Sequence, residues 1–302
     1  MDIIESMRIF VQVVDDGSFT RAAEALGIHK PYITKAIQNI ECQLGTRILH
    51  RTTRKVGVTP EGEEFYRRCR IILDEVSDTF EFFAGAERHI SGKLRIDLPI
   101  ILAKNIIVPA LPEFSRLYPD IELIIGASDQ SVDIIAEGID CVVRLGELRD
   151  STLIARKIGS IPMMTCASPK YIEQFGTPNN LEELANHRAV NYFSGPNRKV
   201  MEWQFEVEGT ITATRMRSAI MVNDTETFVS SGLAGFGIMH GLRPALEPHV
   251  MSGDLVHLLP NIQSPAKPIS IIYPDRRYLA PKVKAFADWL TSTISKQGYN
   301  PL

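Results

Sequence analysis

The N-terminal part of the chain has apolar residues at helical spacing. In residues 3–14 they recur on one face, which predicts a first helix that ends at Asp15-Asp16-Gly17. The Ala-rich run Arg21–Leu26 predicts a second, short helix. Ser18 stands before this run as a suitable N-cap, and Gly27 follows it where a helix favours a residue that tolerates the left-handed conformation.

A third helix is expected directly after a tight corner. Ile28-His29-Lys30 forms the corner, Pro31 takes the first helical position, and Gly45 closes the helix. Its inward face is apolar at helical spacing, at Ile33, Ile37, Ile40 and Leu44. Its outward face carries groups that reach phosphates and base edges, namely Lys30, Tyr32, Thr34, Lys35, Gln38 and Asn39. The pattern is that of a helix-turn-helix whose second helix is the recognition helix.

Basic charge is concentrated around this motif. Residues 29–55 hold six Lys or Arg against one acid, Glu41, although the chain as a whole has a net charge of −3. The basic residues are Lys30, Lys35, Arg47, Arg51, Arg54 and Lys55. A short β-like piece, residues 55–59, follows them and suggests a wing against the DNA backbone. Such local charge in an acidic chain indicates a nucleic-acid-binding segment.

Residues 1–65 resemble the N-terminus of LysR-type transcriptional regulators without a gap. The resemblance rests on Phe10, GSFTRAA-EAL, P-x-I-T-x-x-I-x-x-I-E-x-x-L-G and R-I-L-x-R-x-x-R-x-x-x-x-T-P-E-G. The sequence departs from the family pattern at His29-Lys30, where Ser-Gln is common. It departs again at His50, where Phe is usual and packs behind the wing.

The expected partner of this segment is double-stranded promoter DNA. The residues expected to contact it are Ser18, Thr20, Arg21, His29, Lys30, Pro31, Tyr32, Thr34, Lys35, Gln38, Arg51, Thr52, Thr53, Arg54 and Lys55.

A long helix is predicted over residues 61–90. Thr59 is its cap, Pro60 its first position, and Glu61 and Glu63 place negative charge in its first turn. Apolar residues then recur in a seven-residue repeat, which suits pairing with a second copy. The seam is expected at Phe65, Cys69, Ile72, Val76 and Phe83. The alternative is that the stripe packs on the chain's own domain. The resemblance implies a dimerising linker helix here, and a dimer of dimers.

After Ser91-Gly92 the pattern changes to strands that alternate with helices. Strands are expected at residues 93–98, 122–125, 141–144, 163–167, 189–192, 211–214, 219–222, 237–239 and 270–273. Helices are expected at residues 106–118, 130–137, 169–175, 181–185, 225–231 and 281–295. Strand–helix–strand units of this length predict a mostly parallel sheet.

The chain is expected to cross between two α/β lobes at residues 160–162 and again at residues 267–268. This arrangement, with P-D-I-E-L, G-I-D-C-V-V-R-L-G, A-S-P-K-Y-I, V-N-D, G-x-G-I and Y-P-D-R-R-Y-L, resembles the periplasmic-binding-protein-like sensor domain of the same family. The expected fold is therefore α/β overall. An all-α winged helix-turn-helix (1–60) and a linker helix (61–91) precede a two-lobed effector-sensing domain (92–302). Lobe I comprises 92–161 and 268–302, and lobe II comprises 162–267.

An effector site is expected outside the carboxyl ends of the parallel strands. The candidates there are Pro99, Ile100, Ile101, Phe193, Ser194, Asn223, Asp224, Phe236 and Gly237. Many relatives place hydroxyl residues after the first strand, where helix N–H groups help to bind a carboxylate. Here Ile100 and Ile101 stand in that place, which favours a bulky apolar effector or a site that makes little use of this helix terminus. The alternative is that these are core residues.

Other features limit the function further. The four cysteines are far apart and form no C-x-x-C pair, as expected for reduced thiols in a cytosolic protein. The N-terminus MDIIESMRIF does not resemble a signal peptide, and no apolar run approaches the ~20 residues of a membrane span. A cytoplasmic protein without a membrane partner is expected.

Three other groups of residues do not meet the requirements of a nucleotide, metal or catalytic site. Gly235, Gly237 and Gly241 give G-x-G-x-x-x-G, one residue off a dinucleotide loop. The histidines form no i, i+4 pair, so no metal is expected, nor any cofactor. Ser194 lacks the G-x-S-x-G elbow of a hydrolase nucleophile.

We therefore expect a non-enzymatic bacterial transcription factor that binds DNA, self-associates and senses an unknown small molecule, with RNA polymerase as a possible partner. The rival hypothesis is a solute-binding or enzymatic α/β protein with an incidental helical N-terminus. The basic 29–55 segment and the lack of a catalytic constellation weigh against that rival.

Overall fold

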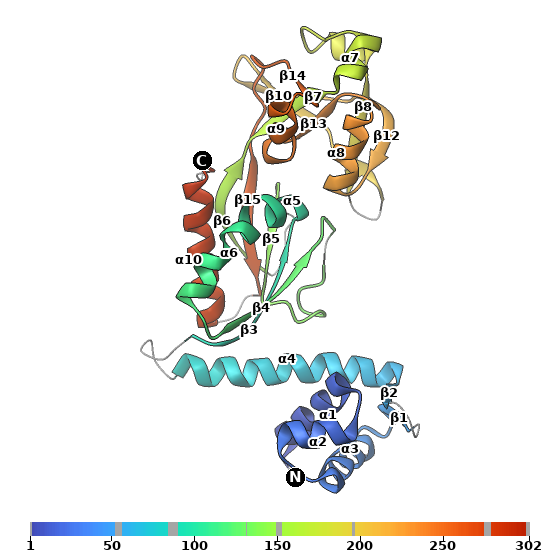
Figure 1. Cartoon of the computed structure of the whole chain (residues 1–302), viewed down its shortest axis with the longest axis vertical. Helices are drawn as coiled ribbons and strands as arrows, with labels where there is room; N and C mark the ends of the chain where they lie inside the picture. The colour runs from blue at the N-terminus through green and yellow to red at the C-terminus, as the bar shows by residue number, and fades with distance from the viewer. Residues whose placement is uncertain are drawn as a thin grey trace. The chain divides into compact units, whose positions relative to one another are not determined.

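The computed structural model describes residues 2–51, 56–83, 90–130, 132–148, 153–194, 197–274 and 279–299. The chain divides into two compact units. The first contains the N-terminal helices and the second contains the α/β part (Figure 1). No helix in the described ranges is both long and apolar enough to cross a membrane.

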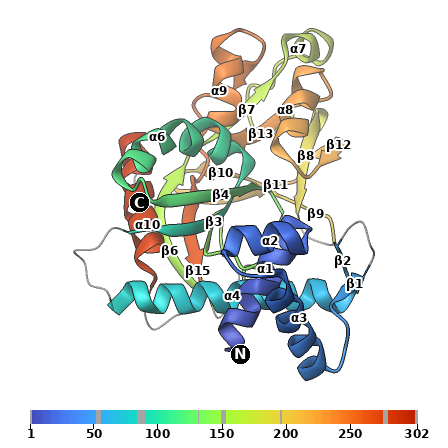
Figure 2. The same cartoon turned by 60° about the horizontal axis from the view of Figure 1, so that its bottom comes forward.

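Three helices form a bundle at the N-terminus, α1 (Ile3–Asp16), α2 (Phe19–Leu26) and α3 (Lys30–Leu44). Their apolar faces share one core with Phe10, Val13 and Ile37, whose side chains are almost completely buried. Each helix ends at a glycine in the left-handed conformation, as predicted: Gly17, Gly27 and Gly45. Figure 2 shows α2 and α3 following each other around the turn.

The wing is an antiparallel pair, β1 (Leu49–Arg51) and β2 (Val56–Val58), with His50 opposite Gly57. Only the second strand was foreseen. The Glu41 carboxylate accepts hydrogen bonds from the amides of Ile48 (3.1 Å) and Leu49 (3.4 Å). The single acid of the basic segment therefore anchors the first wing strand. His50 is exposed, so its expected packing position behind the wing was wrong.

The long helix α4 (Pro60–Phe83) begins on this wing. The Thr59 hydroxyl donates to the Arg47 carbonyl (2.8 Å) and accepts from the Gly62 amide (3.0 Å), so Thr59 caps the helix as predicted. Gly62 packs directly on the Ile48 carbonyl and leaves no room for a Cβ. Ile90 is not helical, so the helix does not reach the predicted end, and residues 84–89 lie outside the described ranges.

Lobe I of the second unit is built on a five-stranded sheet with strand order β4-β3-β5-β15-β6. The strands are β3 (Gly92–Leu98), β4 (Ile121–Ala127), β5 (Cys141–Leu145), β6 (Ile154–Ile161) and β15 (Lys267–Tyr273). β3 runs parallel to β4 and β5, whereas β15 runs antiparallel to β5 and β6. The sheet packs against α6 (Val108–Leu117) and α10 (Pro281–Lys296) through Phe114, Phe286 and Trp289.

Lobe II contains smaller sheets. One is β13-β7-β14, made of β7 (Met163–Ala167), β13 (Met239–Leu242) and β14 (Val256–Leu258). Another is β12-β8-β9, made of β8 (Arg188–Ser194), β9 (Lys199–Val200) and β12 (Arg217–Val222). A hairpin joins β10 (Trp203–Val207) to β11 (Thr210–Thr214). The helices of lobe II are α7 (Pro169–Phe175), α8 (Thr225–Leu233), α9 (Arg243–Met251) and the 3-10 turn η2 (Glu183–Asn186).

Most predicted elements are present, and the two crossings fall where they were expected. β6 and β15 run side by side from one lobe to the other (Figure 1), with Lys267 opposite Ile161. The helix predicted at 130–137 was wrong, because residues 134–138 form turns. The helix predicted at 106–118 begins earlier, at α5 (Ile100–Leu102), and continues through the π-helix η1 (Ala103–Ile107) into α6.

The fit of Gly62 gives a prediction about the first unit. In Gly62→Ala the new methyl group would overlap the Ile48 carbonyl oxygen and lie 2.8 Å from Val58 Cγ1. Overpacking of this kind typically lowers the free energy of unfolding by about 1–3 kcal/mol. Thermal unfolding monitored by circular dichroism should detect the loss. The exposed neighbour substitution Glu63→Ala is the control, and equal stability of the two variants would contradict the packing described here.

Candidate DNA-binding face and effector cleft

Helix α3 presents a polar face to solvent. Ile33, Ala36 and Ile37 are buried, whereas the residues between them point outward. The exposed positions on α3 and its cap include His29, Lys30, Pro31, Tyr32, Lys35, Gln38 and Asn39, with Thr34 half-buried. The predicted inward positions Ile33, Ile37 and Ile40 are buried, but Leu44, which was also predicted to face inward, is 43% exposed.

Three of the expected DNA contacts, Ser18, Arg21 and Tyr32, also have roles within the chain. The Ser18 hydroxyl caps α2 by accepting from the Arg21 amide (3.4 Å), and the Arg21 guanidinium donates to the Asp16 carbonyl. The Tyr32 hydroxyl donates to the Glu5 carboxylate (3.0 Å), and this bond is the first cause of the raised pKa of Tyr32. The ammonium groups of Lys30 and Lys35 have no ion-pair partner among the described residues. Thr20 is exposed.

The remaining predicted DNA contacts cannot be placed. Thr52, Thr53, Arg54 and Lys55 lie outside the described residues, as does the side chain of Arg51.

The predicted seam of α4 is divided by the structure into two parts. Phe65 packs on Phe10 with 5.3 Å between ring centroids, and Cys69 is completely buried in the core of the first unit. Cys69 was therefore wrongly assigned to a seam, since it is already buried within one chain, whereas Phe65 is partly buried against the same core. Ile72 (39% exposed) lies one and two helical turns before Val76 and Phe80, and Phe80 is 74% exposed although the heptad pattern did not include it. The side chain of Phe83 is outside the described part.

A cavity of about 250 Å³ lies between the two lobes. Lobe I contributes Pro99, Ile101, Ser128, Asp129, Arg144, Leu145 and Gly146 to its wall. Lobe II contributes Met163, Tyr192, Ser194, Met201, Glu202, Trp203, Gln204, Thr225, Phe228, His240, Gly241, Leu242 and Ala245, and the crossing segment adds Pro265 and Lys267. This volume is just below the ~300–1,000 Å³ of typical ligand sites, so it suits a small molecule.

Three of the nine predicted effector residues line this cavity: Pro99, Ile101 and Ser194. Asp224 instead caps α8 by accepting from the Thr227 amide (2.8 Å), and Asn223 uses its carbonyl to accept from the Tyr192 hydroxyl (2.8 Å). Phe236 is 51% exposed, and Gly237 fits closely against the backbone of Arg188. Ile100 and Phe193 are also absent from the wall. The rule about strand ends found the region but not the individual side chains.

The charged residues of the wall differ in how they are paired. Arg144 forms an ion pair with buried Asp97 (2.7 Å). Desolvation lowers the pKa of the half-buried Lys267, and the charge of Glu147 acts in the opposite direction. Burial, followed by the charge of Lys267, lowers the pKa of His240 to about 3. His240 is therefore a neutral ring, with Thr165 Oγ1 2.9 Å from its Nδ1 and the rings of Trp203 and Phe205 beside it.

The missed wall residues carried a partial sequence signal. Asp129 follows the carboxyl end of β4, and Arg144 lies near the end of β5, so the same strand-end rule applies to both. Trp203, on a hairpin strand of lobe II, carried none, because only the tertiary fold brings it to the cleft.

Comparison with known proteins gives a matching family model for each of the two units. The family model for the bacterial regulatory helix-turn-helix protein of the lysR family matches residues 4–63, and the model for the LysR substrate binding domain matches residues 87–295. The chain belongs to the LysR family of transcriptional regulators. It is thus a DNA-binding regulator with an effector-binding domain, in a family whose members oligomerise.

Its relatives in this family match along nearly the whole length. The HTH-type transcriptional regulator YhjC of Escherichia coli is 38% identical over 298 residues, which are 98% of this chain and 99% of that protein. An HTH-type transcriptional repressor of Pseudomonas aeruginosa is 34% identical, and the match covers 98% of this chain and 93% of the repressor. The full-length Vibrio cholerae virulence activator AphB superposes with a TM-score of 0.58 at 30% identity, over 97% of this chain and 99% of AphB.

The buried His240 predicts how stability of the sensing unit depends on pH. Its pKa is about 3 in the folded chain, against about 6.5 in the unfolded chain, so below pH 6.5 the unfolded state binds more protons. Its contribution to stability is present above pH 6.5 and is lost as pH falls toward 3, by about 1.4 kcal/mol per pH unit.

Denaturant unfolding at a series of pH values should measure this loss. His240→Asn removes the titrating ring but keeps a polar group near Thr165. Between pH 6.5 and pH 5 the free energy of unfolding of the wild type should therefore decline by about 2 kcal/mol more than that of the variant. Parallel pH profiles for the two proteins would contradict the assignment.

Proposed function

We propose that this regulator binds promoter DNA as a dimer or a dimer of dimers, places α3 in the major groove, and responds to a small molecule in the cleft between its lobes. The observation that carries the proposal is the exposed polar face of α3. A helix of this kind reads base edges with its N-terminal residues, and its basic groups bind phosphates.

The residues of this face differ in what they can contribute. Gln38 can form two hydrogen bonds to adenine, which gives sequence discrimination. Lys30 and Lys35 can contact guanine or phosphate, and phosphate contacts add affinity for any sequence together with salt dependence. We also propose the wing residues Arg51 and Arg54 as phosphate contacts, since they belong to the basic segment.

The seam of the dimer is proposed at the apolar face of α4 formed by Ile72, Val76 and Phe80. These residues are four apart and therefore share one side of the helix. A 74% exposed phenylalanine such as Phe80 is unfavourable in water, and a second copy of the same helix would cover it.

A ligand that favours one arrangement of the lobes would shift the population of regulator states and so change how the paired α3 helices meet the operator. RNA polymerase is a further proposed partner, because the regulator acts at promoters. The proposed site of action is the cytoplasm, where that DNA is found.

A substitution of Gln38 tests the DNA-reading role. Gln38→Ala should weaken binding to an operator selected by the wild-type protein by about 1–3 kcal/mol, because a bidentate base contact is lost. Binding to random DNA should be unchanged. Fluorescence anisotropy with both DNA fragments measures the two effects.

Gln43→Ala is the matched control, since Gln43 is exposed on another side of the same helix. Equal losses on operator and random DNA would reduce Gln38 to a positioning role. Binding that does not weaken between 50 and 200 mM salt, where a loss of about 10³–10⁵ is expected for 6–10 phosphate contacts, would contradict the DNA-binding face as a whole.

The seam is tested by adding charge to α4. Ile72→Asp and Phe80→Asp would each bury an unpaired carboxylate in the dimer, which is strongly unfavourable. Light scattering should show dissociation, and affinity for the operator should fall with it. Ser77→Asp adds the same charge at an exposed position beside the apolar face, about a quarter turn from Val76, and should weaken the dimer far less. If Phe80→Asp and Ser77→Asp had the same assembly state, the proposed seam would be wrong.

A further inference from the structure

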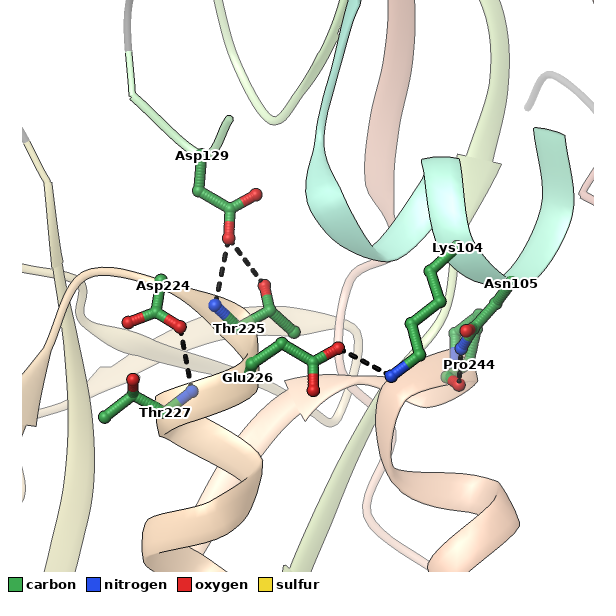
Figure 3. Close-up of polar contacts among 8 residues, drawn as sticks. All are labelled: Lys104, Asn105, Asp129, Asp224, Thr225, Glu226, Thr227 and Pro244. Carbon is green, nitrogen blue, oxygen red and sulfur yellow. Dashed lines mark hydrogen bonds and ion pairs between the residues drawn. The ribbon is translucent and has the colours of Figure 1, made fainter. Parts of the chain in front are cut away.

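The Asp129 carboxylate joins the two lobes inside the cleft. Asp129 lies after β4 in lobe I, and its Oδ1 accepts from the Ile100 amide (3.1 Å). Its Oδ2 accepts three bonds from lobe II, from the Thr225 amide (2.9 Å), the Thr225 hydroxyl (2.8 Å) and the Tyr192 hydroxyl (3.1 Å). Figure 3 shows the two bonds to Thr225 spanning the gap between the lobes.

The donors around this carboxylate are of the kind that bind an anion. Thr225 is the first residue of α8, and Ile100 is the first residue of the helical run that continues through η1 and α6. Amides in a first turn have no partner within the helix and favour negative charge. Burial, with the nearby charge of Asp129 and its hydrogen bond, raises the pKa of Tyr192, so its hydroxyl remains a donor.

Capping of α8 does not require Asp129. Asp224 already caps this helix from within lobe II, through the Thr227 amide (2.8 Å; Figure 3). Asp129 therefore brings a second carboxylate to the same helix end, and it comes from the opposite lobe. Its side chain and the two residues that it binds in lobe II all belong to the cavity wall.

The other polar bonds drawn between the lobes are weaker candidates for controlling the cleft. Lys104 forms an ion pair with Glu226 (2.8 Å), but these side chains are 63% and 56% exposed. Exposed pairs of this kind contribute little. The Asn105 amide donates to the Pro244 carbonyl (2.8 Å), and neither residue belongs to the cavity wall (Figure 3).

We propose that Asp129 determines the ligand class of the cleft, because its carboxylate occupies the donors that a carboxylate effector would need at this end of the cavity. A second carboxylate here would meet a like charge, and the amides of Ile100 and Thr225 are already bonded to Asp129. The effector group that reaches Thr225 and Tyr192 is therefore not a carboxylate or another anion. The inference rests on the proposed effector function of the cleft.

The test is to remove the side chain and supply a carboxylate from solution. In full-length Asp129→Ala the amides of Ile100 and Thr225 and the Thr225 hydroxyl lose their acceptor, whereas Tyr192 keeps the Asn223 carbonyl. The unfolding midpoint of the sensing unit should therefore fall by about 4–8 °C. Sodium acetate at about 100 mM should then raise this midpoint by about 1–3 °C more than sodium chloride at equal ionic strength. The wild type should show no such difference between the two salts.

Asp224→Ala is the matched control, because it removes a carboxylate from the same helix end but from within one lobe. It should be destabilised without an acetate-specific recovery. Equal recovery in Asp224→Ala and Asp129→Ala would mean a general helix-end effect and would overturn the proposal. Asp129→Ala with no acetate-specific recovery would also overturn it.

Two further measurements keep the test decisive. If Asp129→Ala does not fold, Asp129→Asn replaces it in the test. The asparagine keeps the shape of the side chain but turns its NH₂ group toward the amides that donate to Asp129 in the wild type. The unfolding midpoint of Asp129→Asn should therefore fall below that of Asp224→Asn. A midpoint equal to the wild type would overturn the proposal. Failure of wild-type protein to bind DNA would contradict the proposed function instead.

Discussion

The sensing unit depends on the antiparallel pairing of β6 with β15. Both strands belong to the five-stranded sheet of lobe I, and both continue to the point where the chain enters or leaves lobe II. Because these neighbouring strands are hydrogen-bonded to each other, the lobes are joined along one edge and face each other across the cavity. A change in the angle between the lobes must therefore be absorbed near Ile161 and Lys267. Lys267 is also part of the cavity wall, so the crossing is itself exposed to whatever the cleft binds.

Polar groups are exposed on the DNA-binding face of α3, whereas in the cleft between the lobes most charged groups are paired within the chain. On α3 the groups that would read DNA point into solvent, and the nearby acid Glu41 is occupied by the wing amides of Ile48 and Leu49. The basic face is thereby left without a competing carboxylate from that residue. In the cleft most of the charged groups already have partners within the chain, such as Arg144 with Asp97. A ligand that binds there must therefore contact mainly the apolar side chains of the wall, and it can form hydrogen bonds only with polar groups that are not already paired within the chain.

Helix α4 has two roles at different points along its length. Its first turns are fixed to the first unit, since Gly62 packs on the Ile48 carbonyl and Cys69 is buried in the core. Its later turns expose Ile72 and Phe80. A sequence repeat of apolar residues does not distinguish these situations, because burial within one chain and burial between two chains need the same residue types. The division falls between Cys69 and Ile72, and only the tertiary contacts of each helical turn determine where it lies.

The sequence alone determined what depends on neighbours a few residues apart. The helix-turn-helix, its glycine ends, the cap at Thr59 and the faces of α3 follow from local spacing and local hydrogen bonds, and they were predicted correctly except at Leu44, which is exposed. The alternation of strands and helices was readable in part. Turns replaced the helix expected at 130–137, and β6, β10, β14 and α9 were not predicted. The expected mostly parallel sheet was wrong, because β15 runs antiparallel to β5 and β6 and the β13-β7-β14 sheet is antiparallel. The tertiary structure alone decided which residues line the cleft. Asp129 and Thr225 are far apart in the chain, and no local pattern shows that a carboxylate after β4 meets the first turn of α8. Their meeting follows from how two lobes fold around a shared pair of strands, which is a property of the whole chain and not of any segment.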